Sequence, residues 1–222
     1  MNNPNSIHFE KVNFSYGEQK ILHDLSFSVD KGEFVCLTGK SGCGKSTLLR
    51  LINGLLKRQD GKINILGKDI DSWEIHRLRR NMGYVLQEGA LFPHLTARQN
   101  MYYGMKLNKY SHEKCEQRIN ELLPLVNLER AVLDKFPDTL SGGQRQRVGI
   151  VRAIAHNPDM VLMDEPFSAL DTETRKNLQD LVKNIHHQLN TTFVMVTHDE
   201  EEAKYLGTRI IHMEGGKIKT IS

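Results

Sequence analysis

The stretch "GKSGCGKST", residues 39–47, decides the fold class of this 222-residue chain. It matches the pattern G-x-x-x-x-G-K-[ST], with the apolar run "EFVCLT" before it and helical spacing after it. A strand that passes through a glycine-rich loop into a helix is typical of a phosphate loop in a parallel α/β sheet. The stretch therefore predicts an α/β core that binds a nucleoside triphosphate, and a glycine-rich turn that binds nothing is the weaker alternative.

Each residue type in this loop has a physical reason to be there. The glycines allow backbone N–H groups to turn inward around the β- and γ-phosphates, and Lys45 brings a compact positive charge to the same oxygens. The Ser46 hydroxyl can ligate Mg²⁺, and the helix that follows points its positive end at the triphosphate. The predicted phosphate contacts come from Gly39, Lys40, Ser41, Gly42, Cys43, Gly44, Lys45, Ser46 and Thr47.

The stretch "MVLMDEP", residues 160–166, supplies two carboxylates at the end of an apolar strand. Asp164 is expected at the carboxyl end of the sheet, where Mg²⁺ binds, and Glu165 is expected to face the attacking water as a general base. A DE pair after a strand is most often a helix cap. The phosphate loop upstream makes the metal and base roles the stronger hypothesis.

The rest of the chain alternates between strand and helix patterns. Phe- and Val-rich alternation predicts strands early in the chain, helical spacing dominates the middle third, and short apolar runs predict buried parallel strands. The predicted strands lie within residues 7–16, 22–39, 61–70, 159–166 and 191–199, with a final hairpin over Gly215 and Gly216 in 209–222. The stretch 22–39 is expected to hold two strands separated by the turn Lys31-Gly32-Glu33, and 61–70 is expected to hold a pair with glycine turns. The predicted helices cover residues 45–56, 96–107, 111–126, 142–156 and 172–189. The buried faces are expected to include Leu48, Leu49, Ile52 and Leu55 in the first helix and Leu178, Leu181, Val182 and Ile185 in the last; Thr96 and Ser111 are expected N-caps.

Composition excludes several classes of protein. With 39% hydrophobic and 26% charged residues the chain is typical of a soluble globular protein, and a net charge of +3 gives no reason to expect a nucleic-acid partner. Three cysteines without a CxxC pair favour a reducing compartment and argue against structural zinc. The ten histidines are scattered, and the adjacent His186 and His187 are expected on a helix face in solvent. The polar start "MNNPNSIHFE" is unlike a signal peptide, and no apolar run approaches the ~20 residues that span a bilayer.

Seven ordered motifs carry a resemblance to a known family. Besides the phosphate loop (Walker A motif) and "VLMDEP", they are "NFSYG" with Tyr16, "YVLQEG" with Gln87, "LSGGQ" at 140–144, "SALD" at 168–171, and "VTHDEEEA" with His198. Over nearly its whole length the chain resembles an ATP-binding-cassette (ABC) ATPase. The "LSGGQ" tract is the signature of that family and is far more specific than the phosphate loop.

The resemblance implies ATP and Mg²⁺ as ligands and a role for each motif. It implies that Tyr16 stacks on adenine, that Gln87 contacts Mg²⁺ and the lytic water, and that His198 donates a hydrogen bond to the γ-phosphate. Asp171 would order an interface between two chains. Without the resemblance these residues would be interpreted as a core tyrosine, a surface glutamine, a structural histidine and the start of a helix.

The signature tract explains why one chain has two phosphate-binding elements. In the family, two cassettes pack head to tail, and the signature of one closes over ATP held by the other. The resemblance therefore implies that Ser141, Gly142, Gly143 and Gln144 bind the nucleotide of a second chain, most simply in a homodimer. Three residues depart from the usual pattern: Lys40, expected in solvent, Cys43, expected as a small filler that can be alkylated, and Thr208, where Asp is common.

The resemblance also implies the fold and its boundaries. We expect an α/β phosphate-loop NTPase (RecA-like) core with a parallel sheet, an N-terminal antiparallel β subdomain and an inserted helical signature subdomain. The expected single domain covers residues 1–222, with the core at 1–87 and 158–222 and the helical subdomain at 88–157.

The tracts "EGALFPHLTARQN" and "DEPFSALD" resemble the ATPases of bacterial importers for small solutes. Such a subunit would work at the cytoplasmic face of the inner membrane with transmembrane permease subunits and a solute-binding protein. Exposed groups from Gln87 to Leu95, including Phe92, are expected to dock a permease helix, although Leu91, Phe92 and Leu95 could instead pack within the subdomain. The alternative is a soluble, non-transport ABC ATPase in DNA repair, chromosome work or translation. A GTPase would need an NKxD tract, which this chain lacks.

Overall fold

The computed structural model describes residues 5–222, which divide into two compact units. The first unit contains residues up to Arg79 together with Asn190–Ser222, and the second contains Arg80–Leu189. The predicted subdivision with a helical part at 88–157 stays a prediction. Residues 1–4 of the polar N-terminal stretch lie outside the described residues. Across 5–222 no helix has both the length and the apolar character needed to cross a membrane.

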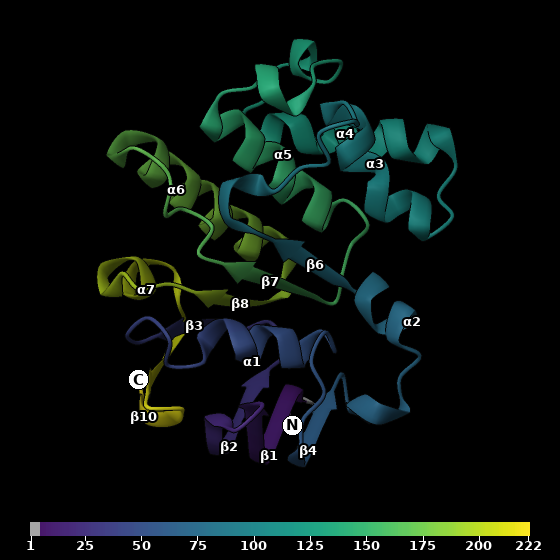
Figure 1. Ribbon diagram of the computed structural model, residues 1–222. Helices are drawn as coiled ribbons and strands as arrows, with labels where there is room; N and C mark the ends of the chain where they lie inside the picture. The colour runs from purple at the N-terminus through teal and green to yellow at the C-terminus, as the bar shows by residue number, and fades with distance from the viewer. Residues whose placement is uncertain (1–4) are drawn as a thin grey trace. The chain divides into compact units, whose positions relative to one another are not determined.

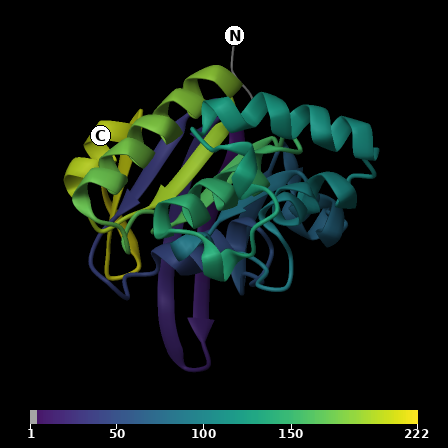
Figure 2. The same cartoon turned by 90° about the horizontal axis from the view of Figure 1, so that it is seen from above.

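The first unit contains an antiparallel sheet. Its strands are β1 (Asn5–Tyr16), β2 (Gln19–Asp30), β4 (Asp60–Ile65) and β5 (Lys68–Asp69), in the order β2-β1-β4-β5. Figure 2 shows β1 and β2 as a long hairpin. Ile7, Phe9, Val12 and Phe14 are buried, with a register shift between Phe9 and Val12. Alternating apolar residues thus form the predicted N-terminal antiparallel part.

The same unit contains the parallel strands that lead to the phosphate loop. β3 (Phe34–Thr38) pairs in parallel with β8 (Thr192–Val196) and β9 (Arg209–Glu214), and β10 (Lys217–Ile221) pairs antiparallel with β9. Every residue of β3 and β8 is buried, as expected for strands in a parallel sheet. Gly215 and Gly216 have φ values of 53° and 74°, which suit the tight hairpin turn predicted there.

Two α-helices and part of a third belong to the first unit. In Figure 1, α1 (Lys45–Ile52) runs between β3 and the antiparallel strands. α7 (Glu200–Leu206) follows β8, a short 3-10 helix η1 (Ile70–Ser72) follows β5, and α2 (Ile75–Arg80) ends where the second unit begins. The predicted first helix was too long: α1 ends at Ile52, Gly54 turns the chain with φ 65°, and Leu55 is 57% exposed rather than buried.

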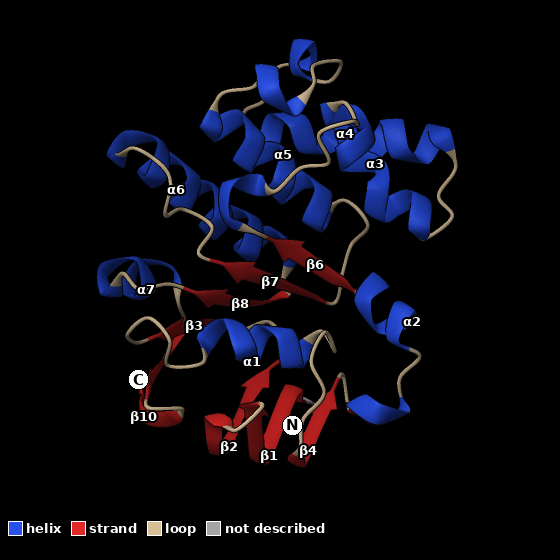
Figure 3. Ribbon diagram, viewed as in Figure 1, coloured by secondary structure: helices blue, strands red, loops and turns tan. Residues whose placement is uncertain are grey.

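The second unit combines two parallel strands with four α-helices. β6 (Met82–Val85) pairs with β7 (Met160–Asp164), and short 3-10 helices interrupt the loops. Figure 3 shows the helices of this unit in blue. They are α3 (Ala97–Leu107), α4 (His112–Leu125), α5 (Gly142–Ile154) and α6 (Thr172–Leu189), with η2 (Gln87–Gly89), η3 (Arg130–Val132) and η4 (Pro137–Thr139).

The predicted N-caps are confirmed in this unit. The Thr96 hydroxyl accepts from the Gln99 backbone N–H at 3.3 Å, and the Ser111 hydroxyl accepts from the Lys114 N–H at 3.3 Å. The predicted inward face of α6 is also buried, at Leu178, Leu181, Val182 and Ile185.

Further elements and the burial of one histidine also differ from the sequence-based expectation. Helices α2 and α7 and strand β6, whose four residues include Gly83, were not predicted from the sequence. A Cβ at Gly83 would lie 2.3 Å from the Ala153 carbonyl oxygen, so α5 packs against β6 at its backbone. The prediction that His186 and His187 both face solvent is wrong for His186, which is buried, because neighbouring helical residues point in different directions.

Candidate functional site

The phosphate loop follows β3 directly and ends in α1. The Lys45 side chain is 6% exposed, and its ammonium donates to the Gly39 carbonyl at 2.6 Å and to the Lys40 carbonyl at 3.1 Å. These bonds hold its positive charge inside the loop. Within the described chain no side chain caps α1, whose N-cap is Gly44. Because the N-cap residue has no side chain to cap the first turn, the end of this helix suits an anionic phosphate.

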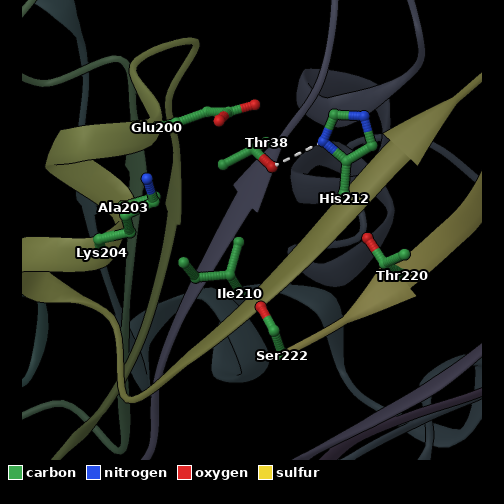
Figure 4. A pocket seen from close by; sticks show the side chains of 8 residues that line it. All are labelled: Thr38, Glu200, Ala203, Lys204, Ile210, His212, Thr220 and Ser222. Atoms are coloured by element: carbon green, nitrogen blue, oxygen red, sulfur yellow. Dashed lines mark hydrogen bonds between the residues drawn. The ribbon is translucent and has the colours of Figure 1, made fainter.

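Strand β9 supports the start of the loop, and the sequence analysis missed this support. Gly39 has φ 136°, and a Cβ there would lie 2.1 Å from the Met213 carbonyl oxygen, so only glycine allows the loop to pass this strand. The Thr38 hydroxyl, one residue earlier, is 3.1 Å from His212 Nδ1 (Figure 4). Their side chains belong to a polar cavity of about 340 Å³, lined by Thr38, Glu200, Ala203, Lys204, Ile210, His212, Thr220 and Ser222. Contacts between β3 and β9 are long-range, so no local sequence signal could have revealed them.

Tyr16 and His198 also belong to the first unit. Tyr16 ends β1, is 43% exposed and packs edge-on against Phe14, with ring centroids 4.9 Å apart. The alternative of a core tyrosine is therefore wrong, and part of the ring is available for stacking. His198 is exposed in the turn between β8 and α7. That turn is ordered locally, because Asp199 caps α7 by accepting from the Glu201 and Glu202 N–H groups at 2.9 and 3.1 Å.

The three departures from the family pattern have different surroundings. Lys40 is exposed, as expected, and Cys43 is 8% exposed, so its thiol fills space within the loop. The Thr208 hydroxyl accepts from the Phe34 N–H at 3.0 Å and donates to the Phe34 carbonyl at 3.2 Å. Thr208 therefore fixes the start of β3 and has a structural explanation.

In the second unit, Asp164 and Glu165 lie at the end of β7. Asp164 is its last residue, and both side chains are half-buried. Glu165 has φ 46°, in the left-handed region that a residue with a Cβ rarely adopts. The Glu165 carbonyl accepts from the Ser168 hydroxyl at 3.1 Å, and this bond helps to hold the unusual conformation. Backbone strain of this kind is concentrated at functional sites, which supports Glu165 as a candidate.

The signature tract forms the start of α5 through a capping box. The Ser141 hydroxyl accepts from the Gln144 N–H at 3.2 Å, and the Gln144 side-chain oxygen accepts from the Ser141 N–H at 3.0 Å. The Ser141 O–H remains a donor when its oxygen accepts. Gly142 and Gly143 occupy the first two positions of the 13-residue helix, where N–H groups point away from the helix. The start of α5 can therefore present a hydroxyl and backbone N–H groups to an anion.

Two polar residues that the sequence analysis missed hold the loop after Gln87. Gln87 is exposed and begins η2. The Arg152 guanidinium donates to the Gly89 and Ala90 carbonyls at 2.9 and 3.0 Å. The buried Asn100 amide bonds to the loop residue Phe92 in both directions, at 2.9 and 3.1 Å. The sequence contains part of this information, because each of the two is a polar residue within the apolar pattern of a helix. It does not show which distant residue is the hydrogen-bond partner.

The apolar run that follows is less exposed than expected. Leu91, Phe92 and Leu95 are half-buried, and the Phe92 ring lies 4.6 Å from the Tyr103 ring. The Arg152 guanidinium also lies over the Phe92 ring, 5.5 Å from its centroid. Phe92 thus packs within the unit and also presents part of its surface beside Tyr103, which is 42% exposed.

Asp171 begins a helix in this structure. Its carboxylate accepts from the Thr174 N–H at 2.9 Å, and this hydrogen bond lowers the pKa of Asp171. The helix-start interpretation is therefore confirmed, and the interface role stays a prediction.

The predicted site residues are divided between the two units. Tyr16, the phosphate loop and His198 belong to the first unit, and Gln87, the signature, Asp164 and Glu165 belong to the second. Within residues 5–222 no three His, Cys, Asp or Glu side chains gather as a ready-made metal cage. The donor types fit Mg²⁺ all the same, because that ion is commonly held by one or two carboxylates together with substrate phosphates.

Comparison with known proteins is consistent with this set of motifs. The family model described as ABC transporter matches residues 22–168. The ergothioneine transport ATP-binding protein EgtV of Helicobacter pylori (strain G27) is 45% identical over 94% of this chain and 97% of its own length. The carnitine transport ATP-binding protein OpuCA of Listeria monocytogenes is 47% identical over 95% of this chain, which spans only 53% of that protein.

Solved structures agree on the fold. The ATP-binding cassette MJ0796, in a dimeric post-hydrolysis state bound to ADP and Pi, superposes with a TM-score of 0.86 at 34% identity, covering 97% of both chains. CbiO1 from Clostridium perfringens, part of the transporter complex cbiONQ, superposes with a TM-score of 0.89 at 26% identity, covering 98% of this chain and 88% of its own. The α/β phosphate-loop fold and the predicted resemblance are thereby confirmed, and this chain belongs to the ABC transporter family.

Proposed function

We propose that this chain is the ATP-binding and ATP-hydrolysing subunit of a bacterial importer for a small solute. The observation that carries the proposal is that one chain contains two elements suited to phosphate, the glycine-rich loop before α1 and the glycine-rich start of α5. A kinase or GTPase has no use for the second element. The transport proteins named above support the importer class over a soluble ABC ATPase.

The motif residues divide the chemistry of hydrolysis between them. The loop N–H groups and Lys45 bind the β- and γ-phosphates of ATP, and Tyr16 stacks on the base. The residues that would hold Mg²⁺ are Ser46, Gln87 and Asp164, and the ion would supply positive charge at the phosphate oxygens. Glu165 accepts a proton from the attacking water, while His198 donates a hydrogen bond to the γ-phosphate.

The signature completes a site on a second copy of the chain. The Ser141 hydroxyl and the N–H groups of Gly142 and Gly143 bind the γ-phosphate held by the partner's phosphate loop, with the positive end of α5 behind them. Gln144 contributes by holding Ser141 in the capping box. Two chains in head-to-tail contact therefore form two sites, and ATP joins them.

Dimer closure would be coupled to solute movement through separate permease subunits. The half-buried Phe92 and its exposed neighbour Tyr103 form the proposed dock for a permease helix, next to the Gln87 loop. The subunit would then work peripherally at the cytoplasmic face of the inner membrane, with a solute-binding protein on the other side.

A mixing experiment tests the shared site. Lys45→Ala removes the buried positive charge of the phosphate loop, and Gly143→Asp places a carboxylate where the partner's γ-phosphate binds. Either variant alone forms only defective sites. A random mixture contains half mixed dimers with one intact site each, so independent sites should restore at most roughly a quarter of wild-type ATP hydrolysis.

The Gly143→Asp variant needs a steric control, because a Cβ at Gly143 would lie 2.8 Å from the Thr174 side-chain methyl. Gly143→Asp/Thr174→Ser removes that methyl and keeps the carboxylate. If this folded double variant hydrolyses ATP at the full wild-type rate as a homodimer, the signature does not complete a site and the proposal fails.

A further inference from the structure

The side chain of Gln146 is buried without hydrogen bonds. It lies in the second turn of α5 and is 0% exposed, and neither its amide nitrogen nor its amide oxygen has a partner among residues 5–222. Buried amides are almost always hydrogen-bonded, to protein or to ordered water. A fully buried side chain with both polar atoms unpaired therefore indicates that something binds to it.

Gln146 lines a small cavity of about 120 Å³ inside the second unit. One wall is the first turns of α5, with Gly142, Arg145 and Gln146, and the other is the segment after Glu165, with Pro166, Ala169 and Leu170. A cavity needs only ~10–15 Å³ of this kind of space to hold a water molecule, provided that polar groups line it. By that measure the cavity has room for a cluster of water molecules, and Arg145 and Gln146 give it polar side chains.

Gln146 cannot leave this position easily. A Cβ at Gly89 would lie 2.6 Å from the Arg145 carbonyl oxygen and 3.4 Å from the Gln146 nitrogen, so the backbone of η2 lies directly against α5 here. A Cβ at Gly149, one turn further along, would lie 3.0 Å from the Gly89 Cα. The close backbone contact fixes the rotation of α5, and Gln146 shares a helix face with Gly142, four residues earlier.

We propose that Gln146 binds a cluster of ordered water molecules in this cavity and thereby positions the start of α5 against the segment that follows Glu165. Gln146 is a positioning residue, since it acts through water on the backbone that carries Gly142 and on the Pro166–Leu170 segment. The kinetic part of this inference rests on the proposed function of the signature. The water site itself does not depend on that function.

Two variants separate this role from simple packing. Gln146→Met keeps the length of the side chain and removes both polar atoms, and Gln146→Asn keeps the amide on a shorter stem. We expect Gln146→Met to lower the melting temperature, because it leaves the water molecules without their partner. It should also lower kcat for ATP by about 10-fold, because the reacting groups would be modestly misplaced. ATP binding should not change. Gln146→Asn should restore most of kcat, because one amide can still bind the cluster.

A crystal structure of the wild-type chain should show ordered waters within hydrogen-bonding distance of the Gln146 amide, and Gln146→Met should lack them. The inference is overturned if the wild-type cavity holds no ordered water, or if Gln146→Met melts at a higher temperature with wild-type kcat, since removing an unsolvated amide stabilises a core. If Gln146→Met does not fold, the inference is tested by the ordered waters in the wild-type crystal structure and by the kcat of Gln146→Asn. Ordered waters and a lowered melting temperature with an unchanged kcat would reject the positioning role and leave the water site standing.

Discussion

Replacing Gly142 with alanine should separate the stability of this protein from its activity. Gly142 is the first residue of α5, and the nearest atoms to a Cβ built there are Leu170 Cδ2 at 3.8 Å and Arg145 Nη2 at 3.9 Å. Both are ordinary van der Waals contacts, so alanine fits without strain. Because alanine has less freedom than glycine in the unfolded chain, the free energy of unfolding should rise by about 0.4–1 kcal/mol. For a chain of this size that is roughly 1–4 °C in Tm.

The expected effect of Gly142→Ala on hydrolysis has the opposite sign. If the first N–H groups of α5 bind the partner's γ-phosphate, an added methyl group stands where the phosphate must approach the backbone. Loss of one donor of this kind lowers turnover by about 10²-fold in comparable oxyanion sites. Binding of ATP to the phosphate loop of the same chain should not change, because Lys45 and α1 are untouched.

Thermal unfolding, equilibrium binding of a fluorescent ATP analogue and steady-state hydrolysis together test this reasoning. Gly143→Ala is the contrasting variant, because its Cβ would lie 2.8 Å from the Thr174 methyl, and it should lower Tm where Gly142→Ala raises it. Adding Thr174→Ser should recover that loss. A Gly142→Ala protein that is more stable and hydrolyses ATP at the wild-type rate would refute the role of the signature backbone.

Three further changes have distinct expected results. Glu165→Gln should bind ATP and accumulate as an ATP-bound dimer in size-exclusion chromatography, with turnover reduced by about 10²-fold or more; near-normal turnover would remove Glu165 from the base role. Phe92→Asp should abolish copurification with membrane subunits and spare ATP binding, whereas Phe92→Leu should spare both; unfolding of Phe92→Asp would assign Phe92 to packing against Tyr103. Burial lowers the pKa of His156 in the folded chain, so below about pH 6.5 the unfolded chain binds more protons than the folded chain. The free energy of unfolding should therefore fall as the pH drops through this region. Urea denaturation of His156→Gln should show a flatter pH dependence, and an unchanged one would exclude His156 as the cause.

The sequence alone was sufficient for the features that depend on neighbouring residues. Period-two alternation revealed β1 and β2, helical spacing revealed α6, and hydroxyl residues before the helices revealed the caps at Thr96 and Ser111. These patterns are reliable because strand alternation, helix periodicity and capping each involve atoms only a few residues apart. The motifs were equally local, since a phosphate loop needs its glycines, lysine and hydroxyl in one turn of chain.

Only the tertiary structure decided which polar and small residues have long-range partners. Arg152 donates hydrogen bonds to Gly89 and Ala90, which are more than 60 positions away in the sequence. Gly39 lies close to the carbonyl of Met213, and Gly83 lies close to the backbone of α5. A glycine required by a close approach looks like any other glycine in the sequence. The left-handed Glu165 was equally invisible, because its conformation depends on how the chain leaves β7, and neighbouring residue types do not encode it. Interactions between neighbouring residues thus determined the helices and strands and the residue types at their ends. Contacts between distant segments determined how rigidly those ends are held.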